Sequence, residues 1–118
     1  MDVTEFVEAI RVTVEQSSIN GCIDNYEDPP GRSPSKKLLE ISDWYKSMPE
    51  HDREMLRKVL ADAVRSSIFG FFSVLDGVRV IEDGPEKGEL ELWHVKNGQR
   101  ILINSSEQNL FHDEYNAV

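Results

Sequence analysis

The sequence contains a single cysteine, Cys22. One thiol cannot form a disulfide within the chain, which excludes the disulfide framework that stabilises many small secreted domains. Cys22 follows Gly21 near the expected C-terminal end of a helix, where the helix dipole disfavours a thiolate. We therefore expect a protein of a reducing compartment and no cysteine nucleophile.

The sequence also lacks a long apolar run and a basic leader. Its longest apolar stretch is Ile68 to Leu75, well short of the roughly 20 residues that span a bilayer as a helix. The chain begins Met-Asp-Val-Thr-Glu, without the basic stretch that precedes the apolar part of a signal peptide. These features predict a cytoplasmic protein.

Motifs that bind metals, phosphates or cofactors are missing as well. The histidines His51, His94 and His112 do not have the His-Glu-x-x-His spacing that places two imidazoles on one face of a helix. The sequence contains no glycine-rich phosphate loop and no Gly-x-Ser-x-Gly nucleophile elbow. We therefore expect no metal, no cofactor and no assigned catalytic residue.

The sequence has fewer basic than acidic residues. The formal net charge is -9 at pH 7, which repels nucleic-acid phosphates and anionic lipid head groups. We expect neither nucleic acid nor a membrane as a partner. The same charge favours encounter with a basic protein, although it also serves plain solubility.

The chain of 118 residues is the size of one ordinary domain. Asp2 and Glu5 have the spacing of a capping box, and apolar residues then recur at helical spacing until Asn20-Gly21. The segment Asp24 to Gly31 is rich in turn formers and predicts an acidic loop. A first helix followed by a surface loop is therefore expected.

Two further helices are predicted in the middle of the chain. Ser33-Pro34 is a typical helix start, and Ser47 to Glu50 forms a second Ser-x-x-Glu box after a tight corner. The last of these helices merges into Ile68 to Leu75, which is apolar nearly all round. This run predicts either the buried end of the helix or a buried strand, and the absence of a turn signal before Asp76-Gly77 favours the helix.

After Asp76-Gly77 the pattern changes from helical to alternating. Asn97-Gly98 predicts a type I′ hairpin turn because both residues accept a positive φ. In that register His94 faces Ile101 and Trp93 faces Leu102. The core-facing residues are then expected to be Leu90, Leu92, Ile101 and Ile103, and the outward ones Glu91, Trp93, Val95, Arg100 and Leu102.

The remaining elements are a strand at Val78 to Glu82 and a short C-terminal helix capped by Ser105 or Ser106. The sequence thus predicts one α+β domain over residues 1–118. About three N-terminal helices are expected to pack on a small antiparallel sheet, formed by the Asn97-Gly98 hairpin and the Val78 to Glu82 strand, followed by the C-terminal helix.

The candidate binding residues are carboxylates and apolar side chains of the hairpin region. They are Glu82, Asp83, Glu86, Glu89, Glu91, Trp93 and Leu102. Exposed aromatics with a charged rim are typical of interfaces, and we favour a non-enzymatic acidic module that binds a basic protein. Charge on a loop and an edge strand also prevents sheet aggregation, and a helix that covers Trp93 is an equal alternative.

Two other functions stay open. A small enzyme or ligand-binding protein would have a pocket between the sheet and the Trp44-Tyr45 helix, with His94, His112 or a carboxylate as acid or base. A homodimer would use the outward sheet face as its subunit contact. Unpaired histidines are usually structural, so the enzyme is the runner-up.

Several segments resemble small bacterial cytosolic proteins with no assigned function. They are Asp43-Trp44-Tyr45-Lys46-Ser47, Phe69-Gly70-Phe71, Leu75-Asp76-Gly77-Val78-Arg79 and Leu110-Phe111-His112-Asp113. That resemblance implies a bacterial cytosolic protein and no catalytic residue. In size and acidity the chain is also similar to bacterial toxin-immunity proteins, which implies an immunity-like binding module.

Overall fold

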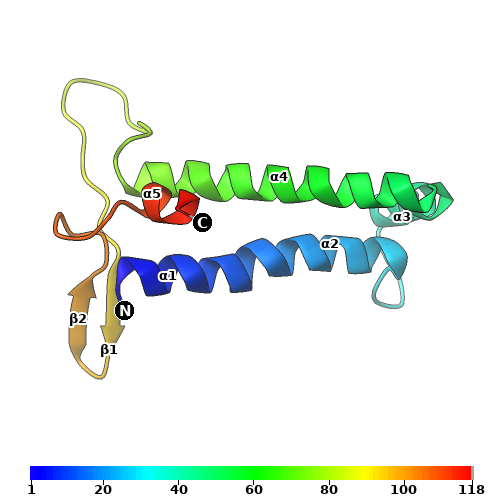
Figure 1. The fold of residues 1–118 in the computed structure, drawn as a ribbon, viewed down its shortest axis with the longest axis horizontal. Helices are drawn as coiled ribbons and strands as arrows, with labels where there is room; N and C mark the ends of the chain where they lie inside the picture. The colour runs from blue at the N-terminus through cyan, green and yellow to red at the C-terminus, as the bar shows by residue number, and fades with distance from the viewer. Residues whose placement is uncertain (118) are drawn as a thin grey trace. The chain divides into compact units, whose positions relative to one another are not determined.

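The computed structural model describes residues 1–117, and it confirms the α+β class. The helices are α1 (Val3–Ile10), α2 (Ser17–Glu27), α3 (Lys36–Ser47), α4 (Glu50–Leu75) and α5 (Phe111–Asn116), with a π-helical segment η1 (Arg11–Gln16) between α1 and α2. The strands β1 (Trp93–Lys96) and β2 (Gln99–Leu102) form an antiparallel hairpin (Figure 1).

The chain divides into two compact units. The terminal unit comprises Met1–Val12 and the chain from Ser66 onward, and the central unit comprises Thr13–Arg65. One boundary lies within η1 and the other within α4. Each unit has buried apolar residues of its own. The single domain expected over residues 1–118 stays a prediction.

The N-terminal helix begins as predicted and ends later than predicted. The Glu5 amide donates to Asp2 Oδ1 (2.8 Å) and the Asp2 amide donates to Glu5 Oε2 (3.2 Å), which completes the capping box. The expected end at Asn20-Gly21 is wrong, because α2 continues to Glu27 and takes in the first half of the predicted acidic loop. A glycine inside a helix costs only about 1 kcal/mol, which packing of the buried Ile19 and Ile23 outweighs.

The core of the central unit lies between α2 and α3, which pack against each other. Ser42 is 1% exposed and donates a hydrogen bond from Oγ to the Tyr26 carbonyl oxygen (2.5 Å). The rings of Tyr26 and Tyr45 lie 5.9 Å apart between centroids. The cap of α3 is Ser35, whose Oγ accepts from the Leu38 amide (3.1 Å), so the helix starts slightly later than the Ser33-Pro34 pattern predicted.

The run Ile68 to Leu75 is the last part of α4, which settles the choice between helix and strand in favour of the helix. Ile68 and Phe72 are buried, but Phe71 is 62% exposed. Burial on every side is therefore wrong for this run. The reason is that partners pack on one face of the run only, the face that meets the aromatic core of the terminal unit.

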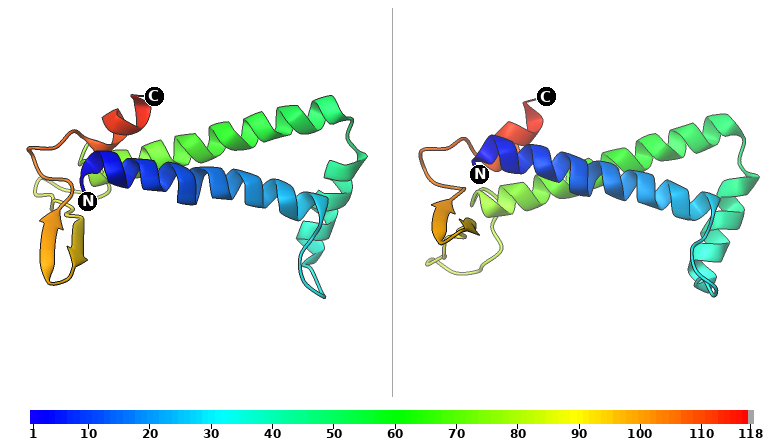
Figure 2. Two further views of the ribbon diagram at one scale, coloured as in Figure 1. Left: turned by 60° about the horizontal axis from the view of Figure 1, so that its bottom comes forward. Right: turned by 90° about the horizontal axis from the view of Figure 1, so that it is seen from below.

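Aromatic rings form the core of the terminal unit. Phe72 of α4 stacks on Phe111 of α5 with ring centroids 5.5 Å apart, and the edges of Phe6 and Tyr115 meet the same Phe72 ring. Phe111 is fully buried. Helix α5 packs against α1, so the two ends of the chain meet over this cluster (Figure 1 and Figure 2). The predicted C-terminal helix is confirmed.

The hairpin forms in the predicted register. His94 faces Ile101 and Trp93 faces Leu102, and the turn residues Asn97 and Gly98 have φ angles of 52° and 78°. The expected core face is only partly confirmed. Ile103 is 3% exposed, but Leu90 and Ile101 are 45% and 43% exposed. A sheet of two strands twists strongly and offers no broad face for helices to cover.

The predicted third strand at Val78 to Glu82 does not form. Within the described residues the sheet has only two strands, and Ile81 is 67% exposed. The physical reason lies at the end of α4, where the Val78 and Arg79 amides both donate to the Ser73 carbonyl oxygen (3.0 Å each). These amides satisfy the helix terminus and are not available to a sheet ladder.

The apolar run at the end of α4 is shorter than a membrane span. No helix within the part of the chain that the structure describes is both long and apolar enough to cross a membrane.

Candidate functional site

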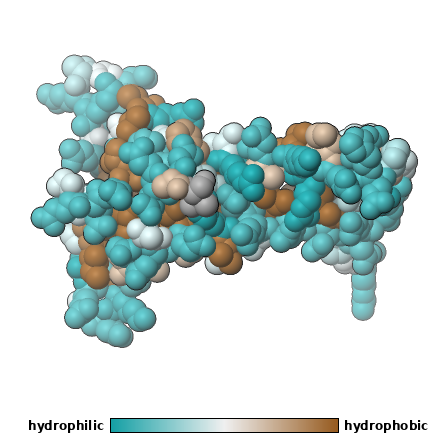
Figure 3. Space-filling model, viewed as in Figure 1, coloured by the Kyte–Doolittle hydropathy of each residue, from teal (hydrophilic) through white to brown (hydrophobic). Residues whose placement is uncertain are grey.

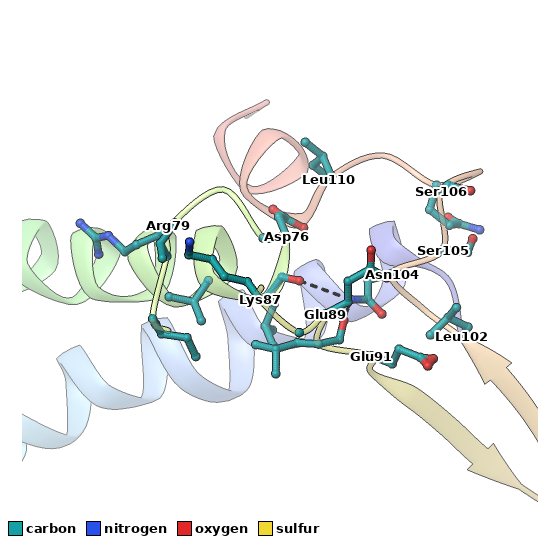
Figure 4. Close-up of a pocket in the computed structure, with 18 of the residues that line it drawn as sticks. Asp76, Arg79, Lys87, Glu89, Glu91, Leu102, Asn104, Ser105, Ser106 and Leu110 are labelled. Carbon is teal, nitrogen blue, oxygen red and sulfur yellow. Dashed lines mark hydrogen bonds between the residues drawn. The ribbon is translucent and has the colours of Figure 1, made fainter. Parts of the chain in front are cut away.

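The terminal unit contains an open cavity of about 760 Å³. Its walls come from the end of α4, from the loop of residues 79–82 and 87–91, and from the segment of residues 102–110. Figure 4 shows Glu89 and Glu91 on the wall that leads into β1, and Ser105, Ser106 and Leu110 on the wall that leads into α5. Residues far apart in the sequence thus line one space.

Asn104 holds these walls together. Its Oδ1 accepts from the Leu92 amide (2.9 Å), and its Nδ2 donates to the carbonyl oxygens of Leu90 (2.7 Å) and Leu75 (3.4 Å). The Ile103 amide donates to the Leu92 carbonyl oxygen (2.8 Å), which continues the hairpin ladder beyond Trp93 and Leu102. One side chain therefore joins the strand entering β1 to the end of α4.

Asp76 fixes the start of α5 from the other side. Its side chain is 1% exposed. Oδ1 accepts from the Phe111 amide (2.9 Å), and Oδ2 accepts from the His112 amide (2.9 Å) and contacts His112 Nδ1 (2.6 Å). The carboxylate thus takes the place of an N-cap side chain. The cap expected at Ser105 or Ser106 is wrong, because the acceptor comes from a distant part of the sequence.

The histidines lie outside the cavity lining. His112 contacts Asp76 through Nδ1 and lies 3.3 Å from Asp113 Oδ1 through Nε2, so both ring nitrogens face carboxylates. His94 is half-buried on β1, and His51 is exposed on α4. Among the described residues, no group of three His, Cys, Asp or Glu side chains could hold a metal ion. The His112 ring therefore helps to position α5.

Carboxylates dominate the charge around the cavity. Glu89 and Glu91 are exposed, and neither forms an ion pair within residues 1–117. Glu82 accepts a hydrogen bond from the Gly88 amide (2.6 Å). Lys87 donates to the Gly84 carbonyl oxygen (2.6 Å) within its own loop, so it neutralises none of these carboxylates directly. Arg79 and Lys87 also line the cavity, but the carboxylates of Asp76, Glu82, Glu89 and Glu91 outnumber them, so the lining is negative overall.

Apolar side chains line the same cavity and remain open to solvent. They are Val80 (62% exposed), Ile81 (67%), Leu90 (45%) and Leu110 (43%). The space-filling view shows apolar surface among hydrophilic groups over the loop and hairpin (Figure 3). Isolated exposed aliphatic residues are normal, but several around one hollow indicate a binding surface.

The structure brings together some of the predicted site residues. Those that line the cavity are Glu82, Glu89, Glu91 and Leu102. Asp83 and Glu86 are exposed on the same loop but lie outside the lining. Trp93 is 40% exposed on β1, and the Arg100 guanidinium lies 5.0 Å from the centre of its ring. Within residues 1–117 Trp93 is thus partly covered and not buried.

Sequence reasoning missed the residues that shape the cavity. They are Asp76, Arg79, Lys87, Asn104 and Leu110. The sequence pattern marks Asp76 only as the residue before Gly77 at the end of a helix, and it assigns no role to Asn104. Their hydrogen bonds join segments that are 12 to 36 residues apart, and no local pattern in a single sequence signals such contacts.

A smaller cavity of about 290 Å³ lies in the central unit and is lined by Ile23, Tyr45 and Arg53, among others. Burial raises the pKa of Tyr45, and the hydrogen bond from its hydroxyl to Glu27 Oε1 (3.2 Å) acts in the same direction. Both effects favour the neutral phenol. Tyr45 therefore has a structural role at this site.

Comparison with known proteins adds no relative: no protein family, no curated protein and no solved structure matches the chain. The resemblance to small bacterial proteins and the analogy with immunity proteins therefore stay predictions. The geometry of the terminal unit supplies the remaining argument about function.

Proposed function

We propose that the protein is a non-enzymatic binding module that docks a basic partner protein at the cavity of the terminal unit. The observation that supports this proposal is the composition of the cavity wall. Exposed apolar side chains at Ile81 and Leu90 lie beside carboxylates at Glu89 and Glu91 that have no ion-pair partner in the described chain.

The two kinds of side chain have different roles in binding. The carboxylates attract positive charge and accelerate encounter, an effect that salt screens. The apolar residues supply affinity, at roughly 25 cal/mol for each Å² removed from water. The cavity volume of about 760 Å³ lies within the usual range for binding pockets. A partner with basic and apolar side chains in close succession fits both requirements.

An immunity-like protein of the bacterial cytoplasm is one protein of this kind, with a basic toxin as its partner. The small enzyme that uses His94 or His112 has less support. Both nitrogens of His112 face carboxylates, and neither ring lines the cavity. General acid or base catalysis requires a ring nitrogen within reach of a substrate.

The test is capture of partner proteins from the native cell with the wild-type protein and with the double variant Glu89→Lys/Glu91→Lys. The variant reverses the charge at the cavity, and we expect the affinity for the captured protein to fall at least about tenfold, equivalent to 1.4 kcal/mol. A matched control, Glu40→Lys/Asp43→Lys, makes the same change in net charge at exposed positions of the central unit.

The proposal also requires that wild-type binding weaken between 50 mM and 500 mM salt and that the captured protein be basic. Equal affinity of the wild-type protein and the cavity variant would contradict it. Equal weakening by the cavity variant and the control variant would show that only the overall charge matters, which would also rule out a docking site at the cavity.

A further inference from the structure

We propose that the partner binds as an extended basic segment that pairs through its backbone with the free edge of β1 and becomes a third strand of the sheet. This inference rests on the proposed function and adds the mode of recognition. It follows from the hydrogen bonds of the hairpin, from unused backbone groups beside the cavity, and from the charge along that edge.

The hydrogen-bonding pattern identifies the free edge. The Ile103 amide donates to the Leu92 carbonyl oxygen, so residues 92 and 103 form a hydrogen-bonded pair of the antiparallel ladder. Hydrogen-bonded and non-hydrogen-bonded pairs alternate along an antiparallel ladder, so His94 and Ile101 form the next hydrogen-bonded pair. The N–H and C=O groups of Glu91, Trp93 and Val95 consequently point away from β2.

Nothing in the described chain uses that edge. Among residues 1–117, β2 is the only strand paired with β1, and no backbone hydrogen bond joins Glu91, Trp93 or Val95 to a further strand. Trp93 and Val95 are 40% and 56% exposed. Isolated two-stranded hairpins are marginally stable in water, so a third strand that pairs with the free backbone groups of β1 would stabilise the sheet.

The cavity provides places for the side chains of an added strand. Neighbouring side chains of a strand point to opposite faces, so alternate residues would turn toward the cavity. Val80, Ile81 and Leu90 offer apolar contacts there, while Glu89 and Glu91 lie where the edge begins. The backbone of residues 80–82 makes no backbone hydrogen bond to any other described segment. An incoming strand with alternating basic and apolar residues matches this surface.

A second copy of this chain is a poor occupant. Each copy has a net charge of -9, so two copies repel each other and gain no charge complementarity at this edge. A basic segment of another protein makes the same backbone contacts with favourable charge.

The test uses Val95→Pro with Val95→Ala as its matched control. Proline at position 95 removes an N–H that points away from β2, so the hairpin keeps its own hydrogen bonds, whereas an added strand loses a donor and meets the proline ring. The alanine variant removes the two methyl groups of the valine side chain and retains the N–H, so it separates the loss of the side chain from the loss of the donor. Circular dichroism and thermal unfolding verify that both variants fold.

The probe is a displayed library of random ten-residue peptides, selected on the wild-type protein. We expect enrichment of peptides with alternating Lys or Arg and apolar residues, at least tenfold weaker binding to Val95→Pro, and binding to Val95→Ala within about threefold of wild type. Amide exchange at Glu91, Trp93 and Val95 should slow on binding. A selected peptide can be N-methylated at its odd or at its even positions, and both versions keep every side chain. The version that loses the N–H groups facing β1 should not bind the wild-type protein.

Several results would overturn the inference, and they separate it from the proposed function. If Glu89→Lys/Glu91→Lys weakens binding but Val95→Pro does not, strand addition is wrong and the basic docking site stands. If no basic peptide is enriched, strand addition is wrong, and the docking site is decided by the capture experiment alone. If neither variant weakens binding, both proposals are wrong. A concentration-dependent dimer that Val95→Pro abolishes would assign the edge to a second copy of the chain.

Discussion

Replacing Asp76 with alanine removes one buried carboxylate that holds α5 in place. The carboxylate accepts hydrogen bonds from the Phe111 and His112 amides and contacts His112 Nδ1, with a side chain that is 1% exposed. Loss of a helix cap costs about 1 kcal/mol. Loss of a hydrogen bond to a charged group costs about 1.5 to 3 kcal/mol of stability. Each amide donor that stays buried without an acceptor lowers the stability further.

We therefore expect Asp76→Ala to lower the free energy of unfolding by about 3 kcal/mol, a large share of the roughly 5 to 15 kcal/mol of a typical domain. Urea unfolding measures this loss as a lower midpoint. The Asp76→Asn variant keeps the size and one acceptor oxygen, and should lose about half as much. Amide hydrogen exchange at Phe111 and His112 should accelerate in both variants.

Asp113→Asn is the matched control. The Asp113 side chain is 68% exposed and lies 3.3 Å from His112 Nε2, and an exposed pair contributes less than about 1 kcal/mol. If Asp76→Ala costs no more than this control and the Phe111 and His112 amides stay protected, Asp76 does not hold α5, and our account of this end of the terminal unit is wrong.

Two further changes test the central and terminal units. Burial and the hydrogen bond to Glu27 raise the pKa of Tyr45 above its ordinary value of 10.0, so its contribution to stability is complete below pH 10 and is lost as the pH rises through the raised pKa. The difference in free energy of unfolding between wild type and Tyr45→Phe, measured by urea unfolding, should therefore shrink as the pH rises above 10. In Gly70→Ala the new methyl group meets only the guanidinium end of the exposed Arg79 side chain, which has to move aside. We expect a gain of up to about 1 kcal/mol from helix propensity, and a lower melting temperature would contradict this.

Features with local causes could be predicted from the sequence. The Asp2 and Glu5 capping box and the Asn97-Gly98 turn depend on residues within a few positions of one another, and both form as expected. The turn also determined the strand register, because a two-residue loop leaves one way to pair its flanks. Helical periodicity was likewise sufficient to place α4.

Features that depend on distant partners were not predictable in this way. Val78 to Glu82 has strand-forming residues, but its first amides bond to the end of α4. Gly21 is a typical helix end, yet packing continues α2 through it. Part of the candidate site was found because acidic residues cluster in the sequence. The cavity itself was not, since Asp76 and Asn104 act across segments far apart in the chain.

The side chain of Asn104 contains the same carbonyl and N–H groups as a peptide unit, and it bonds to Leu90 and Leu92 as a neighbouring strand would. Backbone pairing is shared by all residue types and resists change by substitution. A hydrogen bond from a side chain, in contrast, is changed by a single substitution. The contact between two walls of the cavity therefore depends on a single position, and a substitution at Asn104 would change it while the backbone pairing of the hairpin stays the same.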